Sequence, residues 1–217
     1  MHTQPLSPHA RGVAAAIAAI AVASLVLQYV LILGATRETI GPLAATVRFF
    51  SFFTILSNTA VTLVCAWAAL GRDGAWSRPG VRAAVALYIG VTGLIYVAIL
   101  RHLWNPTGAQ WWVDVGLHYA TPALYLLWWL ALLPHGHLRW RHVGLFLLFP
   151  LAYVAWVFVR AQWAHEVPYP FLDYTRLGVA RVIGNAAAMS GLFVVGGSLL
   201  RVIDRHLARR ARPTTSA

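Results

Sequence analysis

Thr54, Ser57 and Asn58 form a polar patch within an otherwise apolar part of the chain. Residues three and four positions apart share one face of a helix, so these side chains would lie together. A threonine hydroxyl can act as a nucleophile when a neighbouring base removes its proton. Ser, Thr and Asn side chains also hydrogen-bond between membrane helices as simple packing contacts. The patch therefore has both a catalytic and a purely structural interpretation.

A second polar pair, Asp114 and His118, lies within another apolar run. The two residues are one helical turn apart and would share a face. Pro122 cannot donate to the carbonyl of residue 118, and its ring presses against that carbonyl, so we expect a kink beside the histidine. Such a kink would open a polar cavity in which imidazole could act as a general base. The alternative is a histidine that only stabilises contact with a neighbouring helix.

The composition of the chain places these residues in a membrane. Hydrophobic residues make up 59% of the 217 residues and charged residues only 11%, which is too apolar for a soluble domain. Each of six apolar runs has about the length that crosses a bilayer, roughly 20 residues. We therefore predict an all-α, polytopic membrane protein, a bundle of six transmembrane helices forming one domain over residues 1–217. The predicted spans are 12–34, 49–70, 82–102, 114–133, 142–163 and 179–201, followed by a basic tail at 202–217.

The distribution of arginine predicts the orientation of this bundle. The formal net charge is +11 and no lysine is present. The N-terminus, the second and fourth loops and the C-terminal tail carry eleven arginines against two acidic residues, whereas the other side carries six against four. Positive charge favours the cytoplasmic side, so we expect both termini in the cytoplasm of a cell-membrane protein. Its expected partners are membrane lipids and no nucleic acid, although the basic segment 201–212 could also serve only to fix topology.

This topology brings the two polar groups to the same depth. The second and fourth predicted spans both run inward from the outer face, so Thr54 lies about five residues, or roughly 8 Å, below its boundary. His118 lies about four residues, or roughly 6 Å, below its own. A hydroxyl and an imidazole at matched depth could form a nucleophile and base pair.

Three segments resemble one known family in their order and spacing: the Phe-rich start of the second span leading to Thr54, the segment from His118 to Pro122, and Tyr169 to Asp173 after two tryptophans. Together they are similar to the androgen-induced protein family of multi-pass membrane threonine hydrolases and its prokaryotic six-helix relatives. The resemblance covers residues 15–200. It implies hydrolysis of fatty acid esters of hydroxy fatty acids within the membrane, with Thr54 as nucleophile and His118 as the catalytic histidine.

For such an enzyme we predict that Thr54 attacks an ester carbonyl and that His118 serves as general base and then acid. Asp114 would orient the imidazole, Asn58 is a candidate donor to the tetrahedral oxyanion, and Ser57 supports the patch. The segment after the fifth span could cover the pocket as a lid, or could be a rigid turn at the membrane surface. Its candidate lid residues are Tyr169, Pro170, Phe171 and Asp173.

We predict no metal and no organic cofactor. His135, His137 and His142 lie in a basic loop without nearby carboxylates, which disfavours a metal site. Only His118 lies well inside a span, so a haem held by two histidines is disfavoured too. The main alternative to a hydrolase is a protein that binds or transports a lipophilic ester or fatty acid in the same cavity without covalent chemistry. A purely structural membrane protein is the third interpretation.

Overall fold

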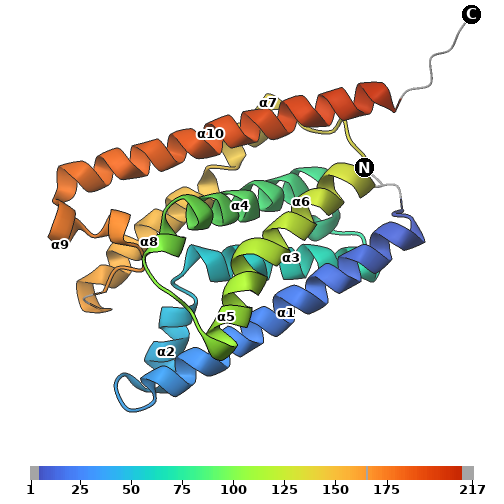
Figure 1. Ribbon diagram of the computed structural model, residues 1–217. Helices are drawn as coiled ribbons and strands as arrows, with labels where there is room; N and C mark the ends of the chain where they lie inside the picture. Colours follow the sequence, from blue (N-terminus) through green and yellow to red (C-terminus); the bar gives the residue numbers. More distant parts are fainter. Residues whose placement is uncertain (1–4, 165, 212–217) are drawn as a thin grey trace, which may run out of the picture. The chain divides into compact units, whose positions relative to one another are not determined.

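The computed structural model of the protein describes residues 5–164 and 166–211, and all regular secondary structure among them is helical (Figure 1). The chain divides into two compact units, one up to Pro134 and one from His135 onward. The predicted all-α class is confirmed for the described residues, and a single membrane domain over residues 1–217 stays a prediction.

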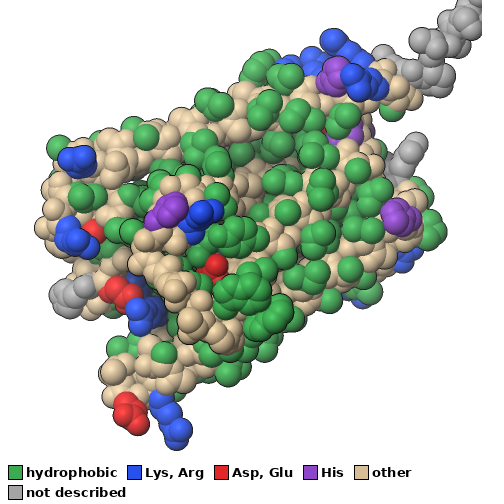
Figure 2. Space-filling view, viewed as in Figure 1, with side chains coloured by type: hydrophobic (Ala, Val, Ile, Leu, Met, Phe, Trp, Pro, Cys, Tyr) green, Lys and Arg blue, Asp and Glu red, His purple; other side chains and the backbone are tan. Residues whose placement is uncertain are grey.

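Five helices are long and apolar enough to cross a membrane, judged by length and composition alone. A sixth is obtained if two helices that meet at an angle of 74°, Gly41–Phe49 and Phe53–Ala69, form one broken span. Apolar side chains cover much of the face drawn in Figure 2, while charged side chains lie in small groups. The predicted six spans are thus the upper end of the observed range. The five are Pro8–Thr36, Pro79–His102, Gly108–Leu132, Trp140–Ala164 and Val179–Arg210.

The predicted boundaries differ most in the fourth and sixth spans. The fourth helix begins at Gly108 rather than 114, because the aromatic segment before Asp114 is helical. The last helix, α10 (Val179–Arg210), continues past 201 into the basic tail. Residues 212–217 of that tail lie outside the described residues.

In the first unit, α1 (Pro8–Thr36) packs along α3 (Phe53–Ala69) (Figure 1). α1 begins where the Ser7 side chain accepts a hydrogen bond from the Ala10 amide at 3.2 Å, with proline in the first turn. Such an N-cap satisfies a backbone donor that would otherwise be unpaired. The buried face of α1 carries small side chains such as Ala14 and Ala21, which allow helices in a membrane to approach closely.

The chain bends sharply between α2 (Gly41–Phe49) and α3. Phe52 is extended, with φ −93° and ψ 128°, and the Ser51 hydroxyl donates to the carbonyl of Val47 at 2.6 Å. A serine that bonds the preceding turn competes with continuation of the helix. The predicted second span, 49–70, thus differs from the structure at its start: α3 begins at Phe53, and Thr54 lies in its first turn.

Two glycines permit close contacts around the fourth span. α4 (Pro79–Ala98) packs against α6 (Thr121–Leu132), and a Cβ on Gly93 would lie 3.1 Å from the Cβ of Pro122. A Cβ on Gly116 would overlap the side chain of Ser24 in α1. Glycine at these positions lets α4 and α1 lie directly against the helix that carries His118.

The second unit contains α7 (Trp140–Leu145), α8 (Leu148–Ala164), α9 (Tyr174–Leu177) and α10. The buried carboxylate of Asp204 in α10 accepts hydrogen bonds from the amides of Gly136 and Leu138, at 2.9 and 2.8 Å. Gly136 has a positive φ of 96°, a conformation that glycine adopts without strain. Asp204 therefore anchors the loop before α7 to α10.

The Gly93 contact leads to a stability prediction. We expect Gly93→Ala to lower the free energy of unfolding by roughly 1–3 kcal/mol, because the added methyl group overpacks the contact with Pro122. Gly34→Ala in α1 is the control, since a Cβ there meets nothing within 4 Å, and alanine is favoured over glycine in a helix. Thermal unfolding of both variants in detergent measures the difference. An equal response of the two variants would contradict the packing argument.

Candidate active site

His118 lies in a π-helical turn between two α-helices. α5 (Gly108–Val115) leads into the π-turn (Gly116–Ala120), which continues as α6. Within it, the amide of Thr121 donates to the carbonyl of Gly116, five residues back. Such π-turns within α-helices are uncommon and often occur at functional sites. The sequence predicts a kink beside His118, and in the structure the local change at this position is the π-turn.

The π-turn determines which carbonyl Pro122 leaves without a donor. Continuing the five-residue register, the amide of residue 122 would pair with the carbonyl of Leu117, but proline has no N–H. The side-chain amide of Asn58 in α3 donates to that carbonyl at 3.2 Å. Asn58 thus supplies a donor to the carbonyl of Leu117, and the loss of a donor at the carbonyl of residue 118 stays a prediction.

Asn58 also binds its own helix, since its amide nitrogen donates to the carbonyl of Thr54 at 2.8 Å. Both hydrogens of this nitrogen are then in use, while its oxygen has no hydrogen-bond partner within the described chain. Donation to an oxyanion would require one of the two bonds to break. That role stays a prediction, and the observed contacts of Asn58 are structural.

Ser57 makes a similar contact between helices. Its hydroxyl lies 2.9 Å from the hydroxyl of Thr92 in α4 and 3.1 Å from the carbonyl of Thr54. Ser57 and Asn58 are completely buried. Both therefore act as the interhelical packing contacts that the sequence offers as one interpretation of the patch.

The structure places Asp114 and His118 next to each other. His118 Nδ1 lies 3.2 Å from Asp114 Oδ1, within ion-pair distance but without the geometry of a hydrogen bond. The same carboxylate oxygen accepts a hydrogen bond from the Tyr96 hydroxyl at 2.5 Å. The Tyr96 ring stacks on the imidazole, with centroids 3.8 Å apart and planes 11° apart. Asp114 and Tyr96 thus hold the imidazole from two sides.

Tyr96 is a site residue that sequence reasoning misses. It lies in α4, where its spacing from other polar residues gives no signal, and it is buried. Its hydroxyl also accepts a hydrogen bond from the indole of Trp104 at 3.2 Å. The loop after α4 is therefore linked to the same network.

An open pocket of about 340 Å³ adjoins this network. Asp114 and Tyr96 lie on its wall together with Arg101 and the aromatic side chains of Trp104, Trp111 and Tyr119. Aromatic and charged groups thus share its wall, which suits a ligand with both apolar and polar parts. Thr54 and His118 do not line this pocket, so it gives access to the carboxylate and the phenol rather than to the predicted nucleophile.

Thr54 lies in the first turn of α3 and is 7% exposed. Because one nitrogen of Asn58 bonds the carbonyls of Thr54 and Leu117, the first turn of α3 and the π-turn are direct neighbours. The predicted depths do not explain this contact, because they are counted from residues 49 and 114, whereas the helices begin at Phe53 and Gly108. A contact between the Thr54 hydroxyl and the His118 imidazole stays a prediction.

The candidate lid is an ordered turn in the second unit. The rings of Tyr169 and Phe171 stack with centroids 5.3 Å apart, and the carbonyl of Phe171 accepts a hydrogen bond from Asn185 in α10 at 2.8 Å. Pro170 begins a short 3₁₀ turn, after which Asp173 caps α9. The hydrogen bond from the Thr175 hydroxyl lowers the pKa of Asp173. These contacts favour a rigid turn, and closure over a pocket stays a prediction.

The link between Asn58 and Pro122 can be tested with a double-mutant cycle. In Pro122→Ala, the amide of residue 122 can reach the carbonyl of Leu117 directly. We therefore expect Asn58→Leu to cost roughly 1–3 kcal/mol in the wild-type background, because a buried carbonyl loses its donor, and clearly less in the Pro122→Ala background. Chemical unfolding of the four proteins gives the coupling energy. Simple additivity would show that Asn58 does not compensate for the proline.

Within the described residues, no group of three His, Cys, Asp or Glu side chains lies close enough together to hold a metal ion. Comparison with known proteins found no matching family model, curated protein or solved structure. The resemblance to the membrane threonine hydrolases therefore stays a prediction that rests on the residues themselves.

Proposed function

We propose that the protein is an intramembrane hydrolase of lipid esters, with Thr54 as nucleophile and His118 as general base. The observation that carries this proposal is the pairing of His118, in the π-turn, with Asp114 at the end of α5. Asn58 ties that turn to the first turn of α3, which holds Thr54. A hydroxyl, an imidazole and a carboxylate in this order form the catalytic arrangement of many acyl-transfer enzymes.

The chemistry follows from the two nitrogens of the imidazole. Nδ1 faces Asp114, which leaves Nε2 to take the proton of the Thr54 hydroxyl as its oxygen attacks the ester carbonyl. The tetrahedral intermediate collapses when His118 returns the proton to the departing alcohol. Water, activated by the same imidazole, then hydrolyses the acyl-threonine and releases a fatty acid.

The position of Thr54 also favours negative charge in the transition state. The beginning of a helix carries a partial positive charge from its aligned peptide dipoles, and Thr54 is the second residue of α3. An oxyanion that forms on a substrate bound there would be stabilised by this field. In the apolar interior of a membrane the effect is larger than in water.

The substrate class is an ester of a long-chain acid that reaches the site from the bilayer. The resemblance to the androgen-induced protein family favours fatty acid esters of hydroxy fatty acids. With both termini in the cytoplasm, as the arginine distribution predicts, Thr54 would lie toward the outer leaflet of the cell membrane.

A fluorophosphonate probe tests the nucleophile. We expect the purified protein to be labelled, and Thr54→Ala and His118→Ala to lose at least about 100-fold in labelling rate, because the hydroxyl or its base is missing. Thr59→Ala is the matched control: Thr59 lies in the same helix, and its hydroxyl bonds the carbonyl of Ile55 at 2.8 Å. It should be labelled as the wild type. Thermal unfolding checks that each variant is folded.

Binding of a lipophilic molecule without covalent chemistry is the second candidate, favoured by the aromatic pocket beside Asp114. It predicts no labelling of the wild-type protein and ligand binding that Thr54→Ala leaves intact. Labelling that persists in folded Thr54→Ala would place the reactive group elsewhere and remove the proposed mechanism.

A further prediction concerns Asp114 as the positioning residue for His118. We expect Asp114→Asn to lower kcat about 10- to 100-fold with little change in KM, because a neutral amide cannot balance the imidazolium that forms in the transition state. Gln110→Ala, one turn earlier in α5, is the control; its side chain bonds Gln28 at 2.8 Å. Ester hydrolysis in mixed micelles measures both. A change in KM alone would assign Asp114 to substrate binding.

A further inference from the structure

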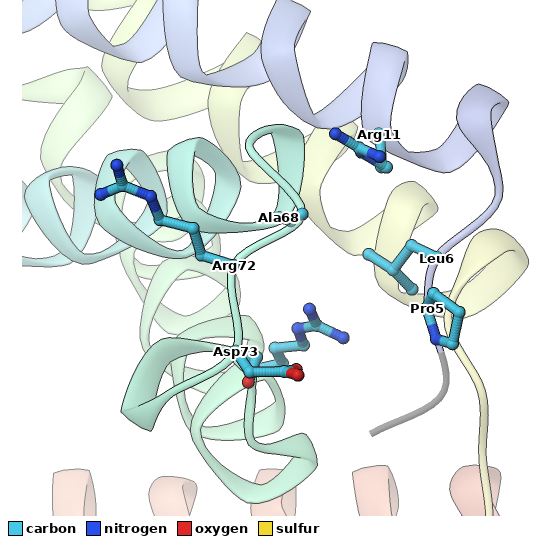
Figure 3. A pocket seen from close by; sticks show the side chains of 9 residues that line it. Pro5, Leu6, Arg11, Ala68, Arg72 and Asp73 are labelled. Atoms are coloured by element: carbon cyan, nitrogen blue, oxygen red, sulfur yellow. The ribbon is translucent and has the colours of Figure 1, made fainter. Parts of the chain in front are cut away.

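A small pocket lies at the end of α3 remote from Thr54 (Figure 3). Its walls come from Pro5 and Leu6 before α1, the loop after α3 and the beginning of α4. The volume is about 70 Å³, enough for a few water molecules or for one small anion such as phosphate. Three arginines and one acidic residue line this arginine pocket: Arg11, Arg72, Arg82 and Asp73.

Arg82 is the unusual member of this group. It lies in the first turn of α4, is only 6% exposed, and its Nε has no hydrogen-bond partner within the described chain. Its Cζ is 6.0 Å from the centroid of the Trp128 ring, at the limit of a cation–π contact. A buried guanidinium is costly unless an anion accompanies it. Asp73 lines the same pocket and supplies one negative charge against the three arginines, so the pocket keeps an excess of positive charge.

Arg11 reaches the same pocket from α1. Its Nε donates to the carbonyl of Ala69 at 3.1 Å, which fixes the guanidinium at the end of α3. The group lies against Gly71, where a Cβ would be 3.0 Å from the Arg11 Cζ. Gly71 also has a positive φ of 63°, so a side chain at this position would be strained and would crowd the arginine. The loop therefore leaves room for a second guanidinium beside the pocket.

Arg72 is arranged differently from the other two arginines. In Figure 3 its side chain extends away from Asp73 and Leu6, and its Cζ lies 5.6 Å from the centroid of the Trp67 ring. It lines the pocket without directing its charge into it. A substitution of Arg72 therefore controls for the loss of one positive charge near the pocket.

We propose that Arg82 and Arg11 bind a phosphate group in the arginine pocket, either the headgroup of an anionic lipid or free phosphate. Guanidinium groups pair with phosphate oxygens through two parallel hydrogen bonds. The beginning of α4 adds the positive end of a helix dipole, which favours anions. Thr54 lies fourteen residues before Ala68 in the same helix, or roughly 20 Å away. The site is thus separate from the proposed catalytic one.

The arginine distribution supports a lipid as one source of this phosphate. The loop after α3 and the N-terminal segment belong to the side that is predicted to be cytoplasmic. Anionic lipids are concentrated in that leaflet, and basic groups near the surface attract them. Inorganic phosphate presents the same oxygens to the two arginines, so the experiment has to separate the two sources.

Thermal unfolding of the full-length protein provides the test. Delipidated protein in neutral detergent is titrated with inorganic phosphate at constant ionic strength, and protein in nanodiscs of phosphatidic acid is compared with protein in phosphatidylcholine. We expect a rise in Tm of about 3 °C or more in at least one arm for the wild type. Arg82→Gln should lose this rise, and Arg72→Gln should keep it.

The variants also separate binding from misfolding. Without ligand, Arg82→Gln should unfold below the wild type, because Asp73 in the same pocket loses a counter-charge; the response of each variant is therefore measured from its own ligand-free Tm. A rise in Tm with inorganic phosphate alone identifies free phosphate as the ligand, and a rise in phosphatidic acid nanodiscs alone identifies the lipid. A rise in both arms shows that the pocket binds the phosphate group from either source. The proposal is overturned if the wild type responds in neither arm, if Arg82→Gln responds like the wild type, or if Arg72→Gln loses as much as Arg82→Gln.

Discussion

A carbonyl group inside a membrane helix needs a donor, and proline removes one. In water a solvent molecule would replace it, but in hydrocarbon each unsatisfied backbone group costs several kcal/mol. In this protein the carbonyl of Leu117 lies in the π-turn before Pro122, and it accepts a hydrogen bond from the side-chain amide of Asn58. That hydrogen bond joins α3 to the helix of His118, beside the buried packing of Ile55 against Val113 and Leu117.

The two ends of α3 lie near different polar groups. Near its first turn, the Asp114 carboxylate lies beside the His118 imidazole and accepts a hydrogen bond from the Tyr96 hydroxyl. Near its last turn lie the guanidinium groups of Arg11 and Arg82. The buried polar side chains of Ser57 and Asn58 connect α3 to neighbouring helices. The charged side chains line the pockets instead, and the packed helices hold them there.

The sequence predicts the helical class and the approximate spans because length and hydropathy alone decide them. It also indicates that Asp114 and His118 share a face, since residues four apart meet on any helix. It could not indicate Tyr96 or Thr92, which reach their partners only through packing of α4. The break at Phe52 and the start at Gly108 were missed for another reason. Aromatic residues occur both inside spans and at their ends, so hydropathy does not distinguish the two.

The contact between Ser24 and Gly116 has a consequence for the order of assembly. Synthesis proceeds from the N-terminus, so α1 leaves the ribosome long before the π-turn exists. The surface against which Ser24 lies is incomplete until residue 116 has been made. α1 therefore reaches its native packing only after the helix that carries Gly116 has been made, and a chain truncated between the two would leave α1 without this packing.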